Sequence, residues 1–458
     1  MTVLGRTHRP VVNHELCQSC GVCLRRCPGE FSTDFRRDEG TVRGYLYRRT
    51  DLGRLEELPP CSAACPLGQR VRDYVGLIQK GRFMEALLIV LDDNPLPGVL
   101  GHVCHRPCEK ACLRGSWDEP VGIRELKRYL AAYGSEHRGE VLEALKGRKA
   151  SSNGWKVAIV GAGPAGLGCA FELLMAGCKV TVYDALPQPG GMLRVGIPTF
   201  RLPEEVVDRD VELLLELGME FRGGVRLGKD IRLDELRRES DAVVLALGAW
   251  RDRRLGIPGE DAEGCFGCLE FLQGVREGWI RRLEGRVFVV GGGNAAVDSA
   301  RTALRLGARE VVILYRRRAE DMPADPEEVE AARREGVKVM PLVIPRGVLV
   351  EGEKVKGLEL QRTSLGEPDA SGRPRPVALE GTEFVEEGSA LIVAIGQEAD
   401  LRFFGGDGGR LELDERGQVC GYEGVFAAGD LVTGPSTVVE ALASGQKVAK
   451  EIMGWLRR

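Results

Sequence analysis

The sequence has little excess charge of either sign, few histidines and no apolar run at its N-terminus. Its 64 Lys and Arg residues against 68 Asp and Glu residues leave a formal net charge of −4, so no general attraction to nucleic acid or anionic lipid is expected. The first ten residues lack the apolar segment of a secretory signal, and we therefore expect a cytoplasmic protein. The five histidines show no metal-ligand spacing, which argues against a histidine-based metal centre.

One apolar stretch, residues 157–177, is long enough to be compared with a membrane span. It contains Glu172 and a Gly-x-Gly-x-x-Gly run, and both features favour a buried strand followed by a helix. Hydrophobic residues make up 43% of the chain and charged residues 29%, which is typical of a globular protein. At about 150 residues per domain, the 458 residues predict a chain of several domains.

Glycine and cysteine, by contrast, are abundant. The chain has 61 glycines and 14 cysteines, and nine of the cysteines precede residue 113. From residue 156 onward, short Val- and Ile-rich runs alternate with helical patterns, which is typical of parallel α/β units. Two of these units open with a glycine loop, so we predict an α/β protein with two Rossmann-like dinucleotide-binding domains behind a cysteine-rich helical domain.

The first glycine loop has the context of a dinucleotide site. A strand pattern at 156–160 is followed by the loop, a helix, and a second strand that ends in Asp184. The loop glycines permit a tight turn, close approach of the backbone to a diphosphate, and packing of helix on strand. The diphosphate would lie at the helix N-terminus, and Asp184 would accept bonds from ribose hydroxyls. The loop residues concerned are Gly161, Gly163, Pro164, Ala165 and Gly166.

Further glycine-rich segments indicate which dinucleotide binds there. A loop around residues 189–198 suits contact with a flat ring, and a late strand ends in Ala427-Ala-Gly-Asp430 before a helix. These motifs resemble the pyridine-nucleotide and flavin oxidoreductases that have two dinucleotide domains. The resemblance implies FAD, with Asp430 bonding the ribityl chain. The additional candidate residues are Gly190, Gly191, Met192, Arg194, Gly248, Gly429, Asp430 and Thr437.

The second glycine loop predicts the nicotinamide-nucleotide site. It follows a strand at 286–290, and an alanine replaces its last glycine, which is a frequent variant. The next strand ends in Tyr315-Arg-Arg-Arg318 and has no acid there. Guanidinium groups bind a ribose 2′-phosphate through paired, charge-assisted bonds, so NADP(H) is predicted, with NAD(H) as the alternative. The candidates are Gly291, Gly293, Asn294, Ala295, Ala296, Arg316 and Arg317.

The cysteine-rich segment begins with a ferredoxin-type run. Three thiolates spaced this way surround one iron–sulfur cube, and the fourth, before a proline, can turn toward another cluster. Zinc is the competing interpretation, but zinc favours two separated Cys-x-x-Cys pairs. A second cysteine group follows further along. The candidate ligands are Cys17, Cys20, Cys23 and Cys27 in the run, and Cys61, Cys65, Cys104, Cys108 and Cys112 in the second group.

The second cysteine group adds a more specific resemblance. The motifs Cys65-Pro66, Pro107-Cys-Glu-Lys-Ala-Cys112, the flavin loop, and Tyr315-Arg-Arg with Met322-Pro323 are similar to those of the glutamate synthase small subunit. They also resemble the N-terminal half of dihydropyrimidine dehydrogenase, over about residues 55–458. The resemblance implies an NAD(P)H oxidoreductase with FAD, NADPH and two [4Fe–4S] clusters. It also implies electron exchange with a partner catalytic subunit.

The chain departs from that family shortly before Cys61. Two further family cysteines are expected there, but Gly53 and Glu56 stand at those positions. The ferredoxin-type run is a candidate source of the missing thiolates. We expect one cluster at Cys17, Cys20 and Cys23 and another at Cys65, Cys104 and Cys108, with Cys27, Cys61 and Cys112 competing for the open positions. One cluster in each segment is equally consistent with the count.

We expect the chain to divide at its composition changes into a ferredoxin-like segment (1–45), a helical iron–sulfur domain (46–150), an FAD-binding domain (151–283 and 385–458) and an NAD(P)H-binding domain (284–384). Two alternative functions remain. One is a flavin-dependent thiol reductase that uses the Cys265-x-x-Cys268 pair as a dithiol. The other is an NADH-dependent electron-transfer subunit of a different metal-containing oxidoreductase.

Overall fold

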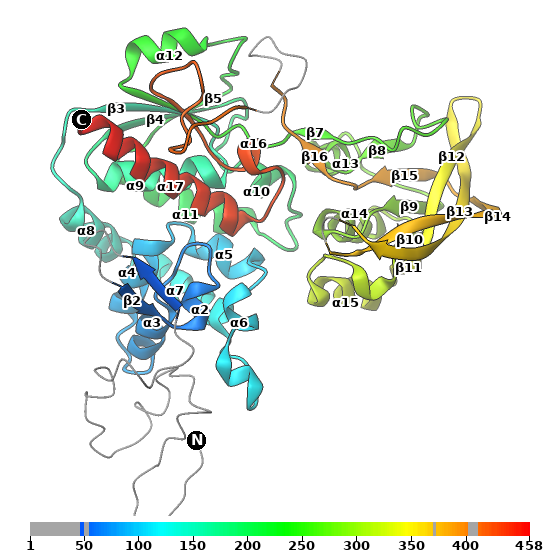
Figure 1. Ribbon diagram of the computed structural model, residues 1–458, viewed down its shortest axis with the longest axis horizontal. Coiled ribbons are helices and arrows are strands. Elements are labelled where there is room, and N and C mark those ends of the chain that lie inside the picture. The colour runs from blue at the N-terminus through cyan, green and yellow to red at the C-terminus, as the bar shows by residue number, and fades with distance from the viewer. Residues whose placement is uncertain (1–45, 50–54, 370–371, 402–410) are drawn as a thin grey trace, which may run out of the picture.

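Two parallel β-sheets form the centres of two α/β domains, and a group of helices packs against the first (Figure 1). The computed structural model describes residues 46–49, 55–369, 372–401 and 411–458. The ferredoxin-type run Cys17–Cys27 and the departure at Gly53 lie outside the described residues. In the described ranges, no helix is both long and apolar enough to cross a membrane. The predicted α/β class with two Rossmann-like domains behind a helical domain is confirmed.

The first domain contains a five-stranded parallel sheet in the order β17-β6-β3-β4-β5. Its central strands are buried along nearly their whole length, as expected for a parallel sheet covered on both faces. The strands are β3 (Lys156–Val160), β4 (Lys179–Asp184), β5 (Glu220–Gly223), β6 (Ala242–Leu245) and β17 (Val425–Ala427). The helices are α9 (Pro164–Met175), α10 (Met192–Val195), α11 (Glu204–Glu216), α12 (Leu233–Glu239), α16 (Asp430–Thr433) and α17 (Val438–Leu456).

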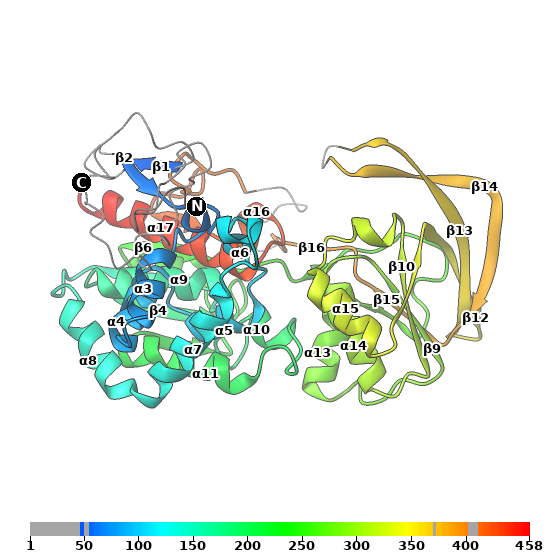
Figure 2. The same cartoon turned by 90° about the horizontal axis from the view of Figure 1, so that it is seen from below.

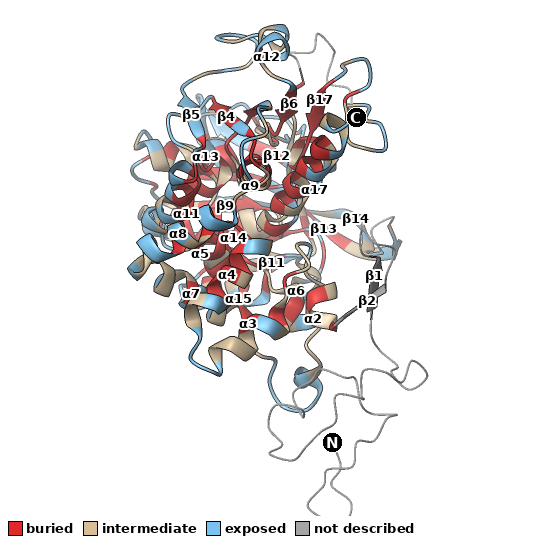
Figure 3. Ribbon diagram, turned by 90° about the vertical axis from the view of Figure 1, so that its left-hand side faces the viewer, coloured by how far each residue is buried: buried red, intermediate tan, exposed pale blue. Residues whose placement is uncertain are grey.

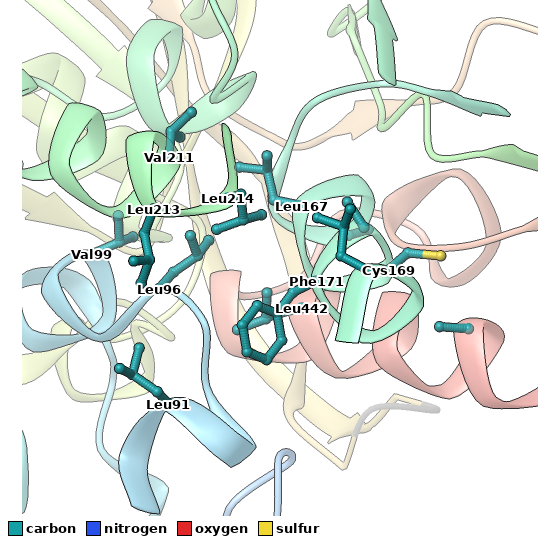
Figure 4. Close-up of a cluster of buried hydrophobic side chains, with 14 of the residues drawn as sticks. Leu91, Leu96, Val99, Leu167, Cys169, Phe171, Val211, Leu213, Leu214 and Leu442 are labelled. Atoms are coloured by element: carbon teal, nitrogen blue, oxygen red, sulfur yellow. The ribbon is translucent and has the colours of Figure 1, made fainter. Parts of the chain in front are cut away.

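Helices α9 and α17 cross at very short range because glycines form their contact. A Cβ atom on Gly445 of α17 would lie 1.9 Å from the carbonyl oxygen of Ala165, and one on Gly168 would lie 2.7 Å from a methyl of Leu442. Figure 4 shows Leu442 of α17 beside Phe171 of α9. The first turn of α9, which begins at the glycine loop, is therefore fixed by α17.

The second domain contains another five-stranded parallel sheet, in the order β11-β10-β9-β15-β8. Helices cover one face, and an antiparallel three-stranded sheet covers the other (Figure 2). The parallel strands are β8 (Cys265–Gly267), β9 (Arg286–Val290), β10 (Glu310–Tyr315), β11 (Lys338–Pro341) and β15 (Ala390–Val393). The other elements are α13 (Cys268–Glu277), α14 (Asn294–Arg305), η3 (Ala319–Asp321), α15 (Pro326–Arg334), β12 (Val343–Glu351), β13 (Lys354–Pro368) and β14 (Pro374–Glu387).

This second sheet extends beyond the range 284–384 that the sequence indicated. Strand β8 with helix α13, and strand β15, were assigned to the FAD-binding domain, but β15 pairs with both β8 and β9. The domain boundary differs from the predicted one because the chain passes between the two domains on a short antiparallel ribbon. This ribbon consists of β7 (Arg251–Asp252) and β16 (Gln397–Glu398). No glycine loop or composition change marks that ribbon in the sequence.

The helical domain shares one hydrophobic core with the first domain. Buried residues, which Figure 3 colours red, occur both in its helices and in the first sheet and belong to one cluster. Leu96 and Val99 lie beside Leu213 of α11, as Figure 4 shows. The elements are β1 (Leu46–Arg49), β2 (Leu55–Leu58), α2 (Pro60–Ala63), α3 (Val71–Ile78), α4 (Phe83–Asp93), α5 (Pro97–Val103), α6 (Pro107–Lys110), η2 (Leu113–Ser116), α7 (Ile123–Glu136) and α8 (Arg138–Arg148).

A buried carboxylate joins these two parts. Asp210 of α11 accepts hydrogen bonds from the backbone N–H groups of Gly98 (3.3 Å) and Val99 (2.8 Å) in the first turn of α5. These groups have no partner within their own helix, so Asp210 of the first α/β domain caps the N-terminus of α5. Burial raises the pKa of Asp210 to about 7.

Candidate functional site

The first glycine loop has the geometry of a diphosphate cradle. Gly161 has a φ of +110°, and a Cβ there would lie 2.1 Å from the carbonyl oxygen of Ala246. A Cβ on Gly166 would lie 1.8 Å from the carbonyl oxygen of Gly161. Gly163, by contrast, has open space at its Cβ position and is the N-cap of α9. A phosphate can therefore approach the backbone at Gly163 and meet the first N–H groups of the helix.

Asp184 stands at the end of β4 and shapes this cradle. Its carboxylate accepts hydrogen bonds from the N–H groups of Ala162 (2.6 Å) and Leu186 (2.8 Å). Burial raises the pKa of Asp184 above its ordinary value. The side chain lines the same pocket as Gly161 and Gly163, which is the position required of a ribose acceptor.

The second glycine loop repeats this geometry at the edge of the second sheet. Gly291 has a φ of +146°, and a Cβ there would lie 2.2 Å from the carbonyl oxygen of Ala394. Gly293, the N-cap of α14, has open space at its Cβ position. Asn294 accepts a hydrogen bond from the N–H of Asp325 through its Oδ1 atom (2.9 Å). This contact fixes the loop against the start of α15.

One pocket connects the two glycine loops. Predicted residues that line it are Gly161, Gly163, Pro164, Ala165, Asp184, Gly191, Met192, Gly248, Asn294, Ala295, Gly429, Asp430 and Thr437. Predicted residues outside its lining are Gly166, Gly190, Arg194, Gly291, Gly293, Ala296, Arg316 and Arg317. The glycines and Ala296 in this second set shape the loops, whereas the three arginines have other surroundings.

Helix α17 points its N-terminus at this pocket. Its N-cap Thr437 and the N3 residue Glu440 form a capping box, with Thr437 N–H donating to Glu440 at 3.0 Å. Asp430 accepts a bond from the Ser436 hydroxyl at 3.1 Å, and burial raises its pKa. The positive end of the long helix and the oxygen atoms of Asp430 thus face the same space.

Arg194 does not face the pocket. Its Nε donates to the carbonyl oxygen of Pro189 at 2.6 Å, and its Nη2 forms an ion pair with Asp208 at 2.5 Å. Arg194 therefore holds the glycine-rich loop 189–196 closed on α11. Direct flavin binding by Arg194 stays a prediction.

The predicted 2′-phosphate arginines have different roles. Arg317 is 1% exposed, and it binds the carbonyl oxygen of Pro374 (2.7 Å) and the carboxylate of Asp369 (2.5 Å). It therefore anchors the end of the β13–β14 hairpin. Arg316 is exposed, and its guanidinium has no hydrogen-bond or ion-pair partner in the described part of the chain. Desolvation and the charge of Arg317 lower the pKa of Arg316, and Arg373 adds further positive charge.

Several pocket residues have no motif in the sequence. Arg201 lines the pocket and forms ion pairs with Asp298 of α14 and with Glu328 of α15 (3.5 Å), so it joins the first domain to the second. The second carboxylate oxygen of Asp298 has no partner among the described residues. Trp250 also lines the pocket, from the ribbon between the domains. Only tertiary contacts bring these residues together.

The helical domain contributes to the same pocket. Val103 and His105, which flank Cys104, both line it. Arg106 follows in the left-handed conformation, with a φ of 60°, and forms an ion pair with Asp325 of the second domain at 3.1 Å. A predicted cluster ligand therefore lies one residue from the wall of the cofactor pocket.

The cysteines of this domain are buried or half-buried among its helices. The charge of a Cys104 thiolate would act on Cys65 and Cys108, and that of a Cys112 thiolate on Cys61. Burial raises the pKa of Cys61 and Cys65, and it raises that of Cys108 to about 12. Such thiols are inert by themselves, but coordination to iron removes the proton. A shared cluster held by Cys65, Cys104 and Cys108 stays a prediction.

Two polar side chains in this region fit a negatively charged cluster. Lys127 of α7 is 3% exposed, and its positive charge acts on Cys65 and Cys108. No carboxylate pairs with it within the described ranges. The buried hydroxyl of Tyr74 also has no partner there. No three His, Cys, Asp or Glu side chains among the described residues gather closely enough for a single ion, whereas a four-iron cube binds each thiolate at a separate iron.

The Cys265 and Cys268 pair has poor properties for a redox dithiol. Burial raises the pKa of Cys265 to about 11, and burial followed by Asp252 raises that of Cys268 further. The Cys268 sulfur lies 2.9 Å from Nε2 of Gln397 and 3.4 Å from Oδ1 of Asp252. Reactive cysteines need a lowered pKa, so the thiol reductase alternative is disfavoured.

Together the two cradles and the cysteine domain define a flavin- and pyridine-nucleotide-dependent oxidoreductase with an iron–sulfur module. A family model described as pyridine nucleotide-disulphide oxidoreductase matches residues 155–445. A second, described as dihydropyrimidine dehydrogenase domain II with a 4Fe-4S cluster, matches residues 57–139. The chain belongs to the glutamate synthase small-chain family of pyridine nucleotide-disulphide oxidoreductases.

Curated relatives span several enzymes. The chain is 42% identical to the NADP(+)-dependent formate dehydrogenase subunit beta of Moorella thermoacetica, over 87% of this chain and 60% of that subunit. It is 39% identical to the NADPH-Fe(3+) oxidoreductase subunit beta of Geobacter sulfurreducens, over 96% and 70%. It is 37% identical to the glutamate synthase [NADPH] small chain of Escherichia coli, over 87% and 89%.

Among solved structures, FprA of Mycobacterium tuberculosis in complex with NADPH matches 67% of this chain and 85% of its own, with a TM-score of 0.56 and 22% identity. That likeness supports the fold. The family matches confirm the predicted FAD, NADP(H) and [4Fe–4S] cofactors. The number of clusters and the individual binding residues stay predictions.

Proposed function

We propose that this chain is the electron-transfer subunit of a cytoplasmic oxidoreductase complex, which exchanges electrons between NADP(H), FAD and [4Fe–4S] clusters and a partner catalytic subunit. The observation that carries the proposal is the shared pocket, because the first glycine loop, the start of α14 and the two neighbours of Cys104 line it. Nicotinamide, flavin and cluster would then meet without a separate carrier. The relatives named above are subunits or chains of three different enzymes, which is consistent with one reductase module serving several partners.

Bound FAD supplies the hydride and single-electron chemistry of such a module. The chain's own residues hold FAD and NADPH and orient them. In this proposal Gly163 and the start of α9 hold the flavin diphosphate, Asp184 holds its ribose, and Asp430 with α17 faces the other end of the pocket. The start of α14 holds the NADPH diphosphate, and Arg316 binds the 2′-phosphate.

Arg201 has the role of setting the distance between the two nucleotide sites. Its ion pair with Asp298 is almost completely buried, because Arg201 exposes 11% and Asp298 4% of the side chain, whereas Glu328 exposes 22%. Charge pairs in such surroundings are strong only when the geometry is fixed. The second domain is consequently held with its glycine loop facing the flavin pocket.

The test has two parts. The purified chain should contain FAD, iron and acid-labile sulfide, and anaerobic NADPH should bleach its flavin. Purification from its own cells, without a tag on any other protein, should recover a larger catalytic subunit in constant ratio. A chain that contains no flavin, or one that reduces only soluble disulfides and elutes alone, would contradict the proposal.

A further inference from the structure

Tyr74 is a completely buried polar residue without a partner in the described part of the chain. It lies in α3 with 0% of its surface exposed, and its Oη atom has no hydrogen bond there. An unpaired buried hydroxyl costs about 1–3 kcal/mol, and native structures contain few such groups. A phenylalanine would fill the same space without this cost, so the hydroxyl calls for an acceptor.

Four thiols of the helical domain lie near enough to act on this phenol electrostatically. They are Cys108, Cys65, Cys61 and Cys104, in order of decreasing strength. Helix α3, which carries Tyr74, also contacts α2, which carries Cys61. An ordinary phenol hydroxyl carries its proton at neutral pH, so the hydroxyl is available as a donor.

We propose that the Tyr74 hydroxyl donates a hydrogen bond to a sulfur atom of the [4Fe–4S] cluster held by Cys65, Cys104 and Cys108, and thereby raises the reduction potential of that cluster. The inference rests on the proposed function, which places a cluster there. Hydrogen bonds to the sulfurs and net charge are among the main determinants of cluster potential. The bond stabilises the extra negative charge of the reduced state, as the buried charge of Lys127 also does.

A substitution that removes only the hydroxyl tests this assignment. The variant Tyr74→Phe keeps the aromatic ring, and Tyr133→Phe is a matched control because Tyr133 of α7 stacks on His137 with ring centroids 4.0 Å apart. Potentiometric titration followed by EPR should show a more negative midpoint potential for one cluster in Tyr74→Phe alone, with unchanged iron and sulfide content. An unchanged midpoint potential would overturn the hydrogen bond.

A second measurement covers the case in which Tyr74→Phe does not retain its cluster. The chain without substitutions is produced with 3-fluorotyrosine in place of tyrosine, because the more acidic phenol of 3-fluorotyrosine is a stronger donor. The midpoint potential should then move in the positive direction, and an unmoved potential contradicts the inference. A purified chain without any cluster signal would contradict the proposed function as well, whereas a loaded cluster that is indifferent to both changes contradicts only the role of Tyr74.

Discussion

The contrast between Arg316 and Arg317 gives a sharp test of cofactor choice. Both follow β10, but Arg316 is exposed without a side-chain partner in the described ranges, whereas Arg317 is buried and binds Pro374 and Asp369. Adjacent arginines thus provide a functional variant and its control. We predict that Arg316→Ala weakens NADPH use and leaves stability unchanged. Arg317→Ala should mainly lower stability and leave the preference for NADPH unchanged.

The magnitudes follow from the bonds that each guanidinium makes. A hydrogen bond to a charged group contributes about 1.5–3 kcal/mol, which corresponds to roughly a 10- to 150-fold rise in the KM for NADPH in Arg316→Ala. NADH lacks the 2′-phosphate, so its KM should change little. Arg317→Ala removes the bonds to the Pro374 carbonyl and the Asp369 carboxylate, which should lower the free energy of unfolding by about 2–3 kcal/mol.

The assay is anaerobic flavin reduction at varied NADPH and NADH concentrations, with thermal unfolding measured on the same preparations. The reasoning is refuted if Arg317→Ala changes the preference between NADPH and NADH while its stability equals that of the unmodified chain. It is equally refuted if Arg316→Ala loses NADH and NADPH activity in the same proportion.

Three further predictions concern the domain contacts and the thiols. Because burial raises the pKa of Asp210 to about 7, its folded state holds a proton more tightly than the unfolded chain, and stability declines as pH rises through that value. Relative to Asp210→Asn, the free energy of unfolding should fall by about 2–3 kcal/mol between pH 5 and 8 in urea titrations, and parallel pH profiles would contradict this. Gly445→Ala places a Cβ against the Ala165 carbonyl and should lower the free energy of unfolding by about 1–3 kcal/mol. The variant should also lose bound FAD on gel filtration, and full retention of FAD would contradict the fixed contact between α9 and α17. Cys265→Ser should retain the NADPH-dependent turnover of the unmodified chain, and loss of turnover at constant iron content and with a flavin that NADPH still reduces would instead revive the dithiol alternative.

The sequence predicted the parts of the site that depend on local geometry. The loops at Gly161 and Gly291 need a positive φ and close backbone contacts, and only a few residue types meet that need. Arg201 and Trp250 have no such local signature, because the ribbon of β7 and β16 and the buried ion pairs bring them to the pocket. Arg317 was assigned to a ligand, since its burial depends on a hairpin more than fifty residues away in the chain.

The same distinction applies to the cysteines. Their spacing predicted iron–sulfur ligands, and the structure buries Cys104 and Cys108 in the core of the helical domain. The buried neighbours Tyr74 and Lys127 belong to ordinary helical patterns, so no sequence rule separates them from other core or surface positions. Their roles depend on which face of α3 and α7 the packing turns toward the thiols.

The central claim is that electrons pass between the nicotinamide site and the cysteine domain through the shared pocket. Rapid mixing of the anaerobic chain with NADPH, with optical detection of the flavin and freeze-quench EPR of the clusters, tests it directly. The account predicts that flavin absorbance falls first and that a cluster EPR signal then rises in the same molecules. A fully bleached flavin with clusters that stay oxidised, although dithionite reduces them, would contradict it.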